Sequence, residues 1–327
     1  MECRLPPGRV HPYRGGRACG RAVGGRVSSA RAGGSLLAEW FWLARPFSLT
    51  AAAVPVLFGT TLALADGAFS WGSFLAMLVA SLLIQAATNM FNEFYDEKRG
   101  LDTASSVGIA GSIVGGRMHA RAVLLGALVC YVIAAVLGFY LVFVGGWTIL
   151  VLGLLSALGG YVYSAGPRPL AYTPASEVAV FLFMGVLIVV IAYAVQNLDL
   201  SPRVFLAALP IGGPVAAILL ANNIRDMESD RRGGRRTVPI VLGRGGAILV
   251  YRALLIEAYA SVAVLILLGL VPPSAVLVVL SAPLLPRLWR GIAAARVPDL
   301  LDPVVKKTAT LHASFGLLYC IGVLLGS

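Results

Sequence analysis

The chain has 327 residues, of which 58% are hydrophobic and 13% are charged. Charged residues make up about a quarter of an ordinary soluble domain, so this composition excludes one and predicts a chain that lies in a bilayer. The formal net charge of +11 would suit nucleic acid, anionic lipid or an anionic substrate. Most of that charge lies in segments whose position explains it without nucleic acid.

Residues 1–44 form a basic segment that is rich in Gly, Arg and Ala and lacks hydrophobic periodicity. Such a segment cannot bury enough apolar surface to fold, so we expect it to be disordered. It has no apolar region of the kind that a secretory signal carries. Two interpretations stay open: a basic arm that touches anionic lipid headgroups, and an extension without function. Residues 45–327 would form the transmembrane domain.

Nine apolar stretches follow, each near the length of about 20 residues that crosses a bilayer as a helix. Backbone polar groups find no water in lipid, so the stretches are expected to be helical. The eighth is short and contains Pro283 and Pro286, so we expect it to be tilted, kinked or partly interfacial. The fold class is therefore all-α, a polytopic membrane protein of about nine helices. The stretches are Phe47–Leu64, Trp71–Phe91, Ala122–Val142, Trp147–Ala165, Glu177–Gln196, Val204–Ala221, Gly246–Leu270, Pro273–Leu288 and Leu311–Leu325.

The distribution of Lys and Arg predicts the orientation. Short cytoplasmic loops retain positive charge, and beyond the N-terminal segment the basic residues gather in residues 92–121, 166–174, 222–245 and 287–308. If the N-terminus is cytoplasmic, only Arg203 lies on the outer side. We therefore expect an integral protein of the cell (inner) membrane with its polar mass, and any active site, facing the cytoplasm.

Two similar polar motifs end the second and the sixth stretch. The first runs from Asn89 to Asp102 and the second from Asn222 to Arg236. Both open with Asn and then supply carboxylates. Asn92 and Asp96 are four residues apart, as are Asn222, Asp226 and Asp230, so each set projects along one face of a helix. Because four helices separate the motifs, both are expected at the same side of the membrane.

Two acidic stripes brought face to face require cations, and this arrangement suits the binding of a diphosphate through metal. Mg²⁺ prefers oxygen ligands and is typically held by one or two carboxylates together with substrate phosphates. The predicted metal ligands are Asn92, Asp96, Asp102, Asp226 and Asp230. The predicted contacts to the remaining phosphate oxygens are Lys98, Arg99, Arg225, Arg235 and Arg236. The neighbouring acids Glu93 and Glu228 are interpreted as solvated loop charges.

These motifs resemble those of the UbiA superfamily of intramembrane prenyltransferases, and in particular its menaquinone-pathway branch. The likeness extends over residues 44–49, 89–114, 166–177 and 222–243. The spacing from Asp96 to Asp102, with Gly100 between them, is like that of the menaquinone branch. Glu93 and the stretch 173–176 depart from the family pattern.

The resemblance implies helices around a central cavity with a cytoplasmic cap, Mg²⁺ as cofactor, a polyprenyl diphosphate donor and an aromatic acceptor. In the menaquinone branch that acceptor, 1,4-dihydroxy-2-naphthoate, loses its carboxylate as it is prenylated. The catalytic residues would be Asp96, Asp226 and Tyr163, whose ring face could stabilise an allylic cation. Substrate contacts would come from Asn89, Asn222, Asn223, Arg45 and Glu177.

Other interpretations stay open. A relative of the same family could prenylate 4-hydroxybenzoate, homogentisate, a tetrapyrrole or a lipid glycerol. From another class, a secondary transporter of an anionic solute also has repeats and polar sites, although transporters place them near the bilayer midplane. Prenyl chain length, oligomeric state and the role of Glu257 stay open as well.

Overall fold

Long apolar helices make up most of the part of the chain that the computed structural model describes, which is residues 35–98, 100, 111–164, 169–196 and 199–327. These residues all lie in the unit Ser35–Ser327, and no β-strand occurs among them. The α-helices are α1 (Leu36–Leu43), α2 (Thr50–Ala65), α3 (Trp71–Lys98), α4 (Ala120–Ser164), α5 (Ser176–Val180), α6 (Ile188–Ala194), α7 (Pro202–Arg225), α8 (Met227–Arg232), α9 (Val238–Leu267), α10 (Leu285–Ala294) and α11 (Pro298–Leu325). A short 3-10 turn η1 (Leu170–Tyr172), a π-helix η2 (Phe181–Leu187) and a 3-10 helix η3 (Pro273–Leu284) complete the chain order.

Each of the nine predicted apolar stretches is helical over most of its described residues, and the all-α membrane fold is confirmed. Seven helical segments of the described chain are long and apolar enough to cross a membrane. Helix α2 is apolar but only 16 residues long, and α4 combines the third and fourth predicted stretches. The count of nine membrane-spanning helices therefore stays a prediction. That the protein is an integral membrane protein is confirmed.

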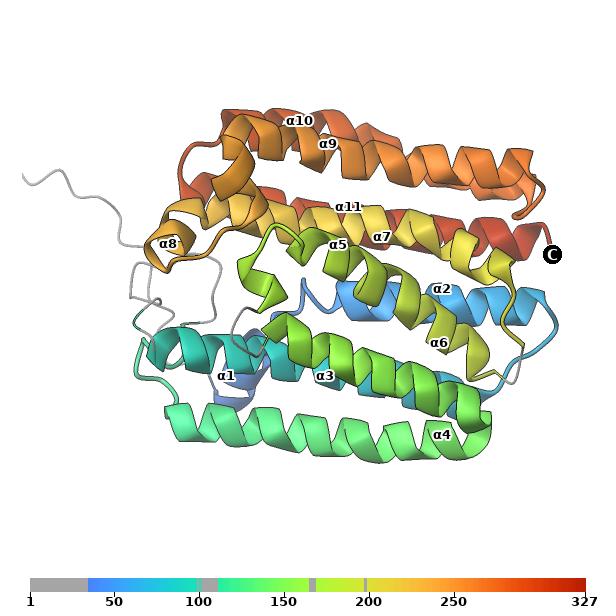
Figure 1. Cartoon of the computed structure of the whole chain (residues 1–327), viewed down its shortest axis with the longest axis horizontal. Coiled ribbons are helices and arrows are strands. Elements are labelled where there is room, and N and C mark those ends of the chain that lie inside the picture. Colours follow the sequence, from blue (N-terminus) through green and yellow to red (C-terminus); the bar gives the residue numbers. More distant parts are fainter. Residues whose placement is uncertain (1–34, 99, 101–110, 165–168, 197–198) are drawn as a thin grey trace, which may run out of the picture. The chain divides into compact units, whose positions relative to one another are not determined.

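Helix α4 consists of two arms that meet at Gly146. This residue has φ 65° and ψ −150°, in a region that glycine enters without the steric cost that a Cβ brings. Figure 1 shows the two arms running in opposite directions along the edge of the bundle. Phe139 and Phe143 on this helix are 76% and 89% exposed, as expected of side chains that face lipid.

The centre of the bundle is formed by α2, α6, α7 and α11, with α7 the most buried of the candidate spans. Phe58 of α2 stacks on Tyr319 of α11 with ring centroids 4.2 Å apart. The π-helix η2 approaches α7 so closely that a Cβ on Gly185 would collide with the Cα of Gly212. Small residues at such a crossing allow helices in a membrane to approach each other closely.

The eighth predicted stretch is divided between η3 and α10. Pro283 lies near the end of η3 and Pro286 near the start of α10, so the change from a 3-10 to an α-helix occurs where prolines interrupt the hydrogen-bonding pattern. The expected irregularity of this span is confirmed.

Helix α1 lies in residues that the sequence analysis assigned to the basic N-terminal segment. Its buried Glu39 accepts hydrogen bonds from Ser112 Oγ at 2.6 Å and Arg117 Nε at 2.8 Å. Glu93 of α3 is also buried and accepts from the backbone N–H of Ser112 at 2.7 Å. The interpretation of Glu93 as a solvated charge is therefore wrong, because Glu93 and Glu39 both accept hydrogen bonds from residues 112–117.

Candidate active site

The two acidic motifs meet at one end of the bundle through the guanidinium of Arg235. Its Nη1 lies 3.0 Å from Asp230 Oδ1 and its Nη2 lies 3.5 Å from Asp96 Oδ1. The same guanidinium lies over the ring of Tyr172, 4.8 Å from the ring centroid. Arg235 thus joins the end of α3 to α8, and the prediction that the motifs face each other is confirmed.

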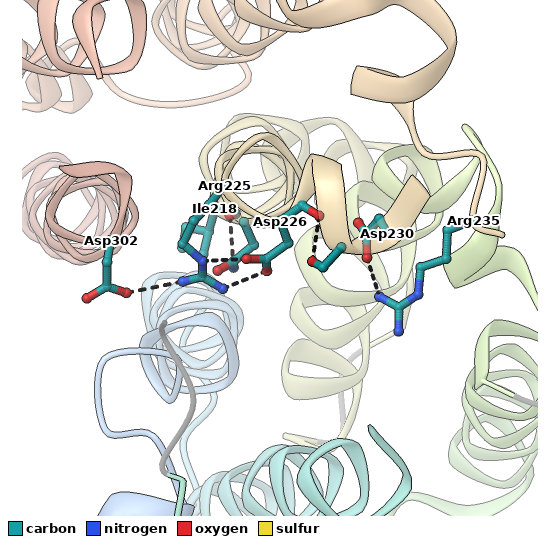
Figure 2. Close-up of polar contacts among 8 residues, drawn as sticks. Ile218, Arg225, Asp226, Asp230, Arg235 and Asp302 are labelled. Carbon is teal, nitrogen blue, oxygen red and sulfur yellow. Dashed lines mark hydrogen bonds and ion pairs between the residues drawn. The ribbon is translucent and has the colours of Figure 1, made fainter. Parts of the chain in front are cut away.

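A second ion-pair network anchors the start of the second motif (Figure 2). The side chain of Arg225 is only 4% exposed and forks onto Asp226, with Nε and Nη2 at 2.8 and 2.7 Å from the two carboxylate oxygens. Its Nη1 donates to Asp302 of α11 at 3.1 Å, and Lys306 Nζ lies 2.5 Å from the other oxygen of Asp302. Because its donors are committed to two carboxylates, Arg225 positions Asp226, and its predicted contact with diphosphate stays a prediction.

Asp302 is a residue that the sequence analysis missed. The spacing of Asp302 and Lys306, four apart near the start of the last long helix, is the one signal that could have drawn attention to it. Asp302 and Lys306 read as an ordinary solvent-exposed ion pair on a helix. The contact of Asp302 with Arg225 could not be predicted, because it depends on how α7 and α11 pack.

Asp230 uses only one of its two carboxylate oxygens, Oδ1, for its ion pair with Arg235. It is 5% exposed, and its Oδ2 is buried without a hydrogen-bond partner among the described residues. Burial raises the pKa of Asp230 to about 6, against the opposing effect of Arg235 and with a further contribution from Asp226. A carboxylate in this condition binds a proton or a cation readily.

The donors present fit Mg²⁺. Asp96, Asp226 and Asp230 offer hard oxygen ligands, and Asp230 Oδ2 lacks a partner that a further positive charge would supply. Among the described residues no group of three or more His, Cys, Asp or Glu is already arranged around a metal position. Arg225 and Arg235 pair with these aspartates, so they neutralise the charges that metal would otherwise offset. Asp102, a further predicted ligand, lies outside the described residues.

The other predicted metal and diphosphate ligands that the structure describes are not part of the ion-pair networks of Arg225 and Arg235. Asn92 is exposed one turn before Asp96 on α3, and Lys98 is exposed at the end of that helix. The backbone N–H of Arg236 donates to the carbonyl of Tyr172 at 2.8 Å. Arg99 lies outside the described residues.

Glu177 and Asn223 form a buried polar pair between α5 and α7. Asn223 Nδ2 donates to Glu177 Oε1 at 2.9 Å, and Ser176 Oγ donates to Glu177 Oε2 at 2.8 Å. Tyr163, at the end of α4, packs against a small apolar cluster that includes Val180 of α5. The predicted substrate roles of Glu177 and Asn223 and the predicted catalytic role of Tyr163 stay predictions.

The structure also describes the remaining predicted substrate ligands, Asn89, Arg45 and Asn222. Asn89 Nδ2 donates to the carbonyl of Ala44 at 2.8 Å and to Ser48 Oγ at 2.9 Å, so it anchors the connection between α1 and α2. Arg45 in that connection has φ 50°, a left-handed conformation that bends the chain. Asn222 Nδ2 donates to the carbonyl of Ile218 within α7.

Comparison with known proteins decides the class. The model of the UbiA prenyltransferase family matches residues 52–298. The chain belongs to this family. It is 41% identical to a 1,4-dihydroxy-2-naphthoate octaprenyltransferase of Bacillus subtilis, over 86% of this chain and 91% of that protein. It is 28% identical to the protein of the same name from Escherichia coli, over 88% and 95% of the two chains.

A solved structure supports the same fold. A UbiA homolog from Archaeoglobus fulgidus, bound to GPP and Mg²⁺, superposes with a TM-score of 0.62 at 18% identity, covering 86% of this chain and 99% of that one. Family membership makes this UbiA protein a membrane enzyme that transfers prenyl groups. The transporter interpretation is thereby set aside.

The contacts of Asp302 lead to a first testable expectation. In Asp302→Asn the negative charge that shares Arg225 is lost, so Arg225 holds Asp226 more tightly and leaves it less able to bind a metal ion. We expect the Mg²⁺ concentration for half-maximal activity to rise about tenfold, the scale typical of changes to the groups that hold metal ligands. A Mg²⁺ titration of activity, together with the thermal midpoint of the protein, measures this.

Asp299→Asn is the matched control, since Asp299 lies in the first turn of the same helix and is exposed. Its Mg²⁺ dependence should equal that of the unaltered protein. Identical titration curves for the two variants would show that Asp302 does not act on the metal site.

Proposed function

We propose that this enzyme transfers a polyprenyl group from its diphosphate to 1,4-dihydroxy-2-naphthoate, with Mg²⁺ as cofactor and with loss of the carboxylate of the acceptor. The observation that carries the proposal is the convergence of Asp96 and Asp230 on one guanidinium, that of Arg235. Carboxylates and a phosphate-binding cation at one point suit a metal diphosphate. The names of the curated relatives support the acceptor.

In this mechanism Asp96, Asp226 and Asp230 would hold the metal, together with Asn92 and Asp102. When bound, Mg²⁺ neutralises charge on the diphosphate and makes it a better leaving group. Arg235 exchanges one of its carboxylate partners for a phosphate oxygen, because a guanidinium binds both kinds of oxygen in the same forked geometry. Lys98, Arg99 and Arg236 would extend this basic rim.

Cleavage of the C–O bond sends its electron pair to the diphosphate and leaves an allylic cation. The ring of Tyr163 is proposed to face that cation, which its π-electrons would stabilise. The acceptor ring then supplies the electron pair for the new C–C bond. Loss of CO₂ from the same ring carbon returns an electron pair to the ring, so no external oxidant or reductant is needed.

Mass spectrometry of the product tests the choice of acceptor. Purified protein with Mg²⁺, a polyprenyl diphosphate and 1,4-dihydroxy-2-naphthoate should yield a prenylated product that lacks the carboxylate. A parallel panel offers 4-hydroxybenzoate, homogentisate, a tetrapyrrole and a glycerol lipid. A product that retains the carboxylate, or turnover with another member of the panel alone, would assign the enzyme to a different branch of the family.

A further inference from the structure

The seam between α9 and the segment η3–α10 carries an open groove that the active site does not use. Its volume is about 670 Å³, and it is lined by Arg252 of α9 and by Pro286, Trp289, Arg290, Ala293 and Ala294 of α10. Figure 1 shows α10 near the end of the bundle at which α8 lies. The groove therefore lies toward the end that carries the two acidic motifs.

The groove contains hydrogen-bond donors that lack acceptors. Arg252 Nε and Trp289 Nε1 are buried and have no hydrogen-bond partner among the described residues. Arg290 Nε reaches only the carbonyl of Pro286, at 3.2 Å. The ion pairs of the described chain include neither arginine. Since buried donors are nearly always satisfied, and two cations here have no carboxylate, the groove is suited to an anion.

A second groove lies farther along the same seam. It has a volume of about 470 Å³ and is almost wholly apolar, with Tyr259, Val262, Ala263 and Ile266 from α9 and Val276 and Val279 from η3 among its lining residues. Arg252, Tyr259, Ala263 and Ile266 are separated by seven, four and three residues, a spacing that places them on one face of α9. The two grooves thus follow one another along the helix, basic first and apolar next.

We propose that the seam binds one anionic phospholipid lengthwise. Its phosphate contacts Arg252, Arg290 and the indole N–H of Trp289, and an acyl chain fills the apolar groove. Guanidinium groups pair well with phosphate oxygens, and Trp and Arg are the side chains typical of the depth at which lipid headgroups lie. Free phosphate would satisfy the first groove alone, whereas a lipid accounts for both.

Native mass spectrometry of the full-length protein, stripped of lipid in detergent, tests this. The probes are phosphatidylglycerol, phosphatidylcholine with the same acyl chains, and inorganic phosphate. We expect one saturable phosphatidylglycerol. Its affinity should fall by at least about fivefold in Arg252→Gln and in Arg290→Gln, in line with the worth of one basic residue near an anionic headgroup. Ala263→Trp, which fills the apolar groove from an exposed position, should weaken binding as well.

Arg287→Gln is the matched control, because Arg287 is exposed on α10 but does not line the groove. An equal loss in Arg287→Gln and Arg252→Gln would overturn the proposal in favour of a nonspecific basic surface. Equal affinity for phosphatidylcholine would remove the argument from charge. Displacement of the lipid by inorganic phosphate, or unchanged affinity in Ala263→Trp, would assign the basic groove to free phosphate. Displacement by a prenyl diphosphate would assign the seam to the donor substrate.

Discussion

The variant Asp96→Ala is expected to lose at least about 100-fold in prenyl transfer, the scale on which losing one group that stabilises developing charge acts. Asp96 lies near the end of α3, 3.5 Å from Arg235, and its side chain is 26% exposed. Its removal therefore leaves the packing of α3 intact. The rate of prenyl transfer and the elution of the protein in detergent are the two measurements.

The companion variant Asp226→Ala should lose activity to a similar extent, but it also leaves the buried Arg225 with Asp302 as its one carboxylate partner among the described ion pairs. Some loss of stability is expected there, since breaking a buried pair is costly.

Glu228→Ala serves as control for both, because Glu228 is 77% exposed and pairs only loosely with Arg231. Its rate should match the unaltered enzyme. Nearly full activity in Asp96→Ala would remove the basis for a metal diphosphate site.

Removal of Mg²⁺ is expected to abolish both turnover and donor binding. The diphosphate is negatively charged, and Asp96, Asp226 and Asp230 lie where it would bind. Two like charges 4 Å apart repel by about 4 kcal/mol near a protein surface. The two arginines cannot offset the repulsion between the diphosphate and three aspartates. Equilibrium dialysis with a labelled, unreactive analogue of the donor, with Mg²⁺ or with EDTA, measures this loss without any turnover.

The thermal midpoint of the protein in EDTA provides the control for that experiment. It should be close to the value with Mg²⁺ alone, because Arg225 and Arg235 already pair with the motif carboxylates in the metal-free chain. Undiminished binding of the analogue in EDTA would show that the basic residues alone hold the diphosphate.

Hydropathy predicted the spans of this protein well because lipid imposes the same requirement on each of them. The polar motifs on α3 and at the end of α7 were also visible, since a charged pattern that recurs at the ends of two apolar stretches has few structural explanations. The turn of α4 at Gly146 falls in the gap between the predicted stretches Ala122–Val142 and Trp147–Ala165. Such features depend on residues that are close in sequence.

The partners of the motif residues could not be predicted in the same way. Arg225 and Arg235 were both expected to contact phosphate, yet one is buried between α7 and α11 and the other bridges the two motifs. Glu93 was expected to be a solvated loop charge, yet it is buried and accepts hydrogen bonds from the backbone N–H groups of Ser112 and Ile113. These outcomes depend on contacts between helices that are far apart in the chain, which no local pattern encodes.

The contact of α1 with Ser112 and Arg117 bears on how the protein can be shortened. A version that starts at residue 45, where hydropathy alone would cut, lacks the Glu39 carboxylate to which Ser112 and Arg117 donate. Without these hydrogen bonds, Ser112 and Arg117 at the active-site end would lose their contact with α1. The resulting fall in activity would be mistaken for a catalytic defect. A shortened protein meant for kinetics or crystallisation should therefore begin no later than Ser35, the residue that caps α1.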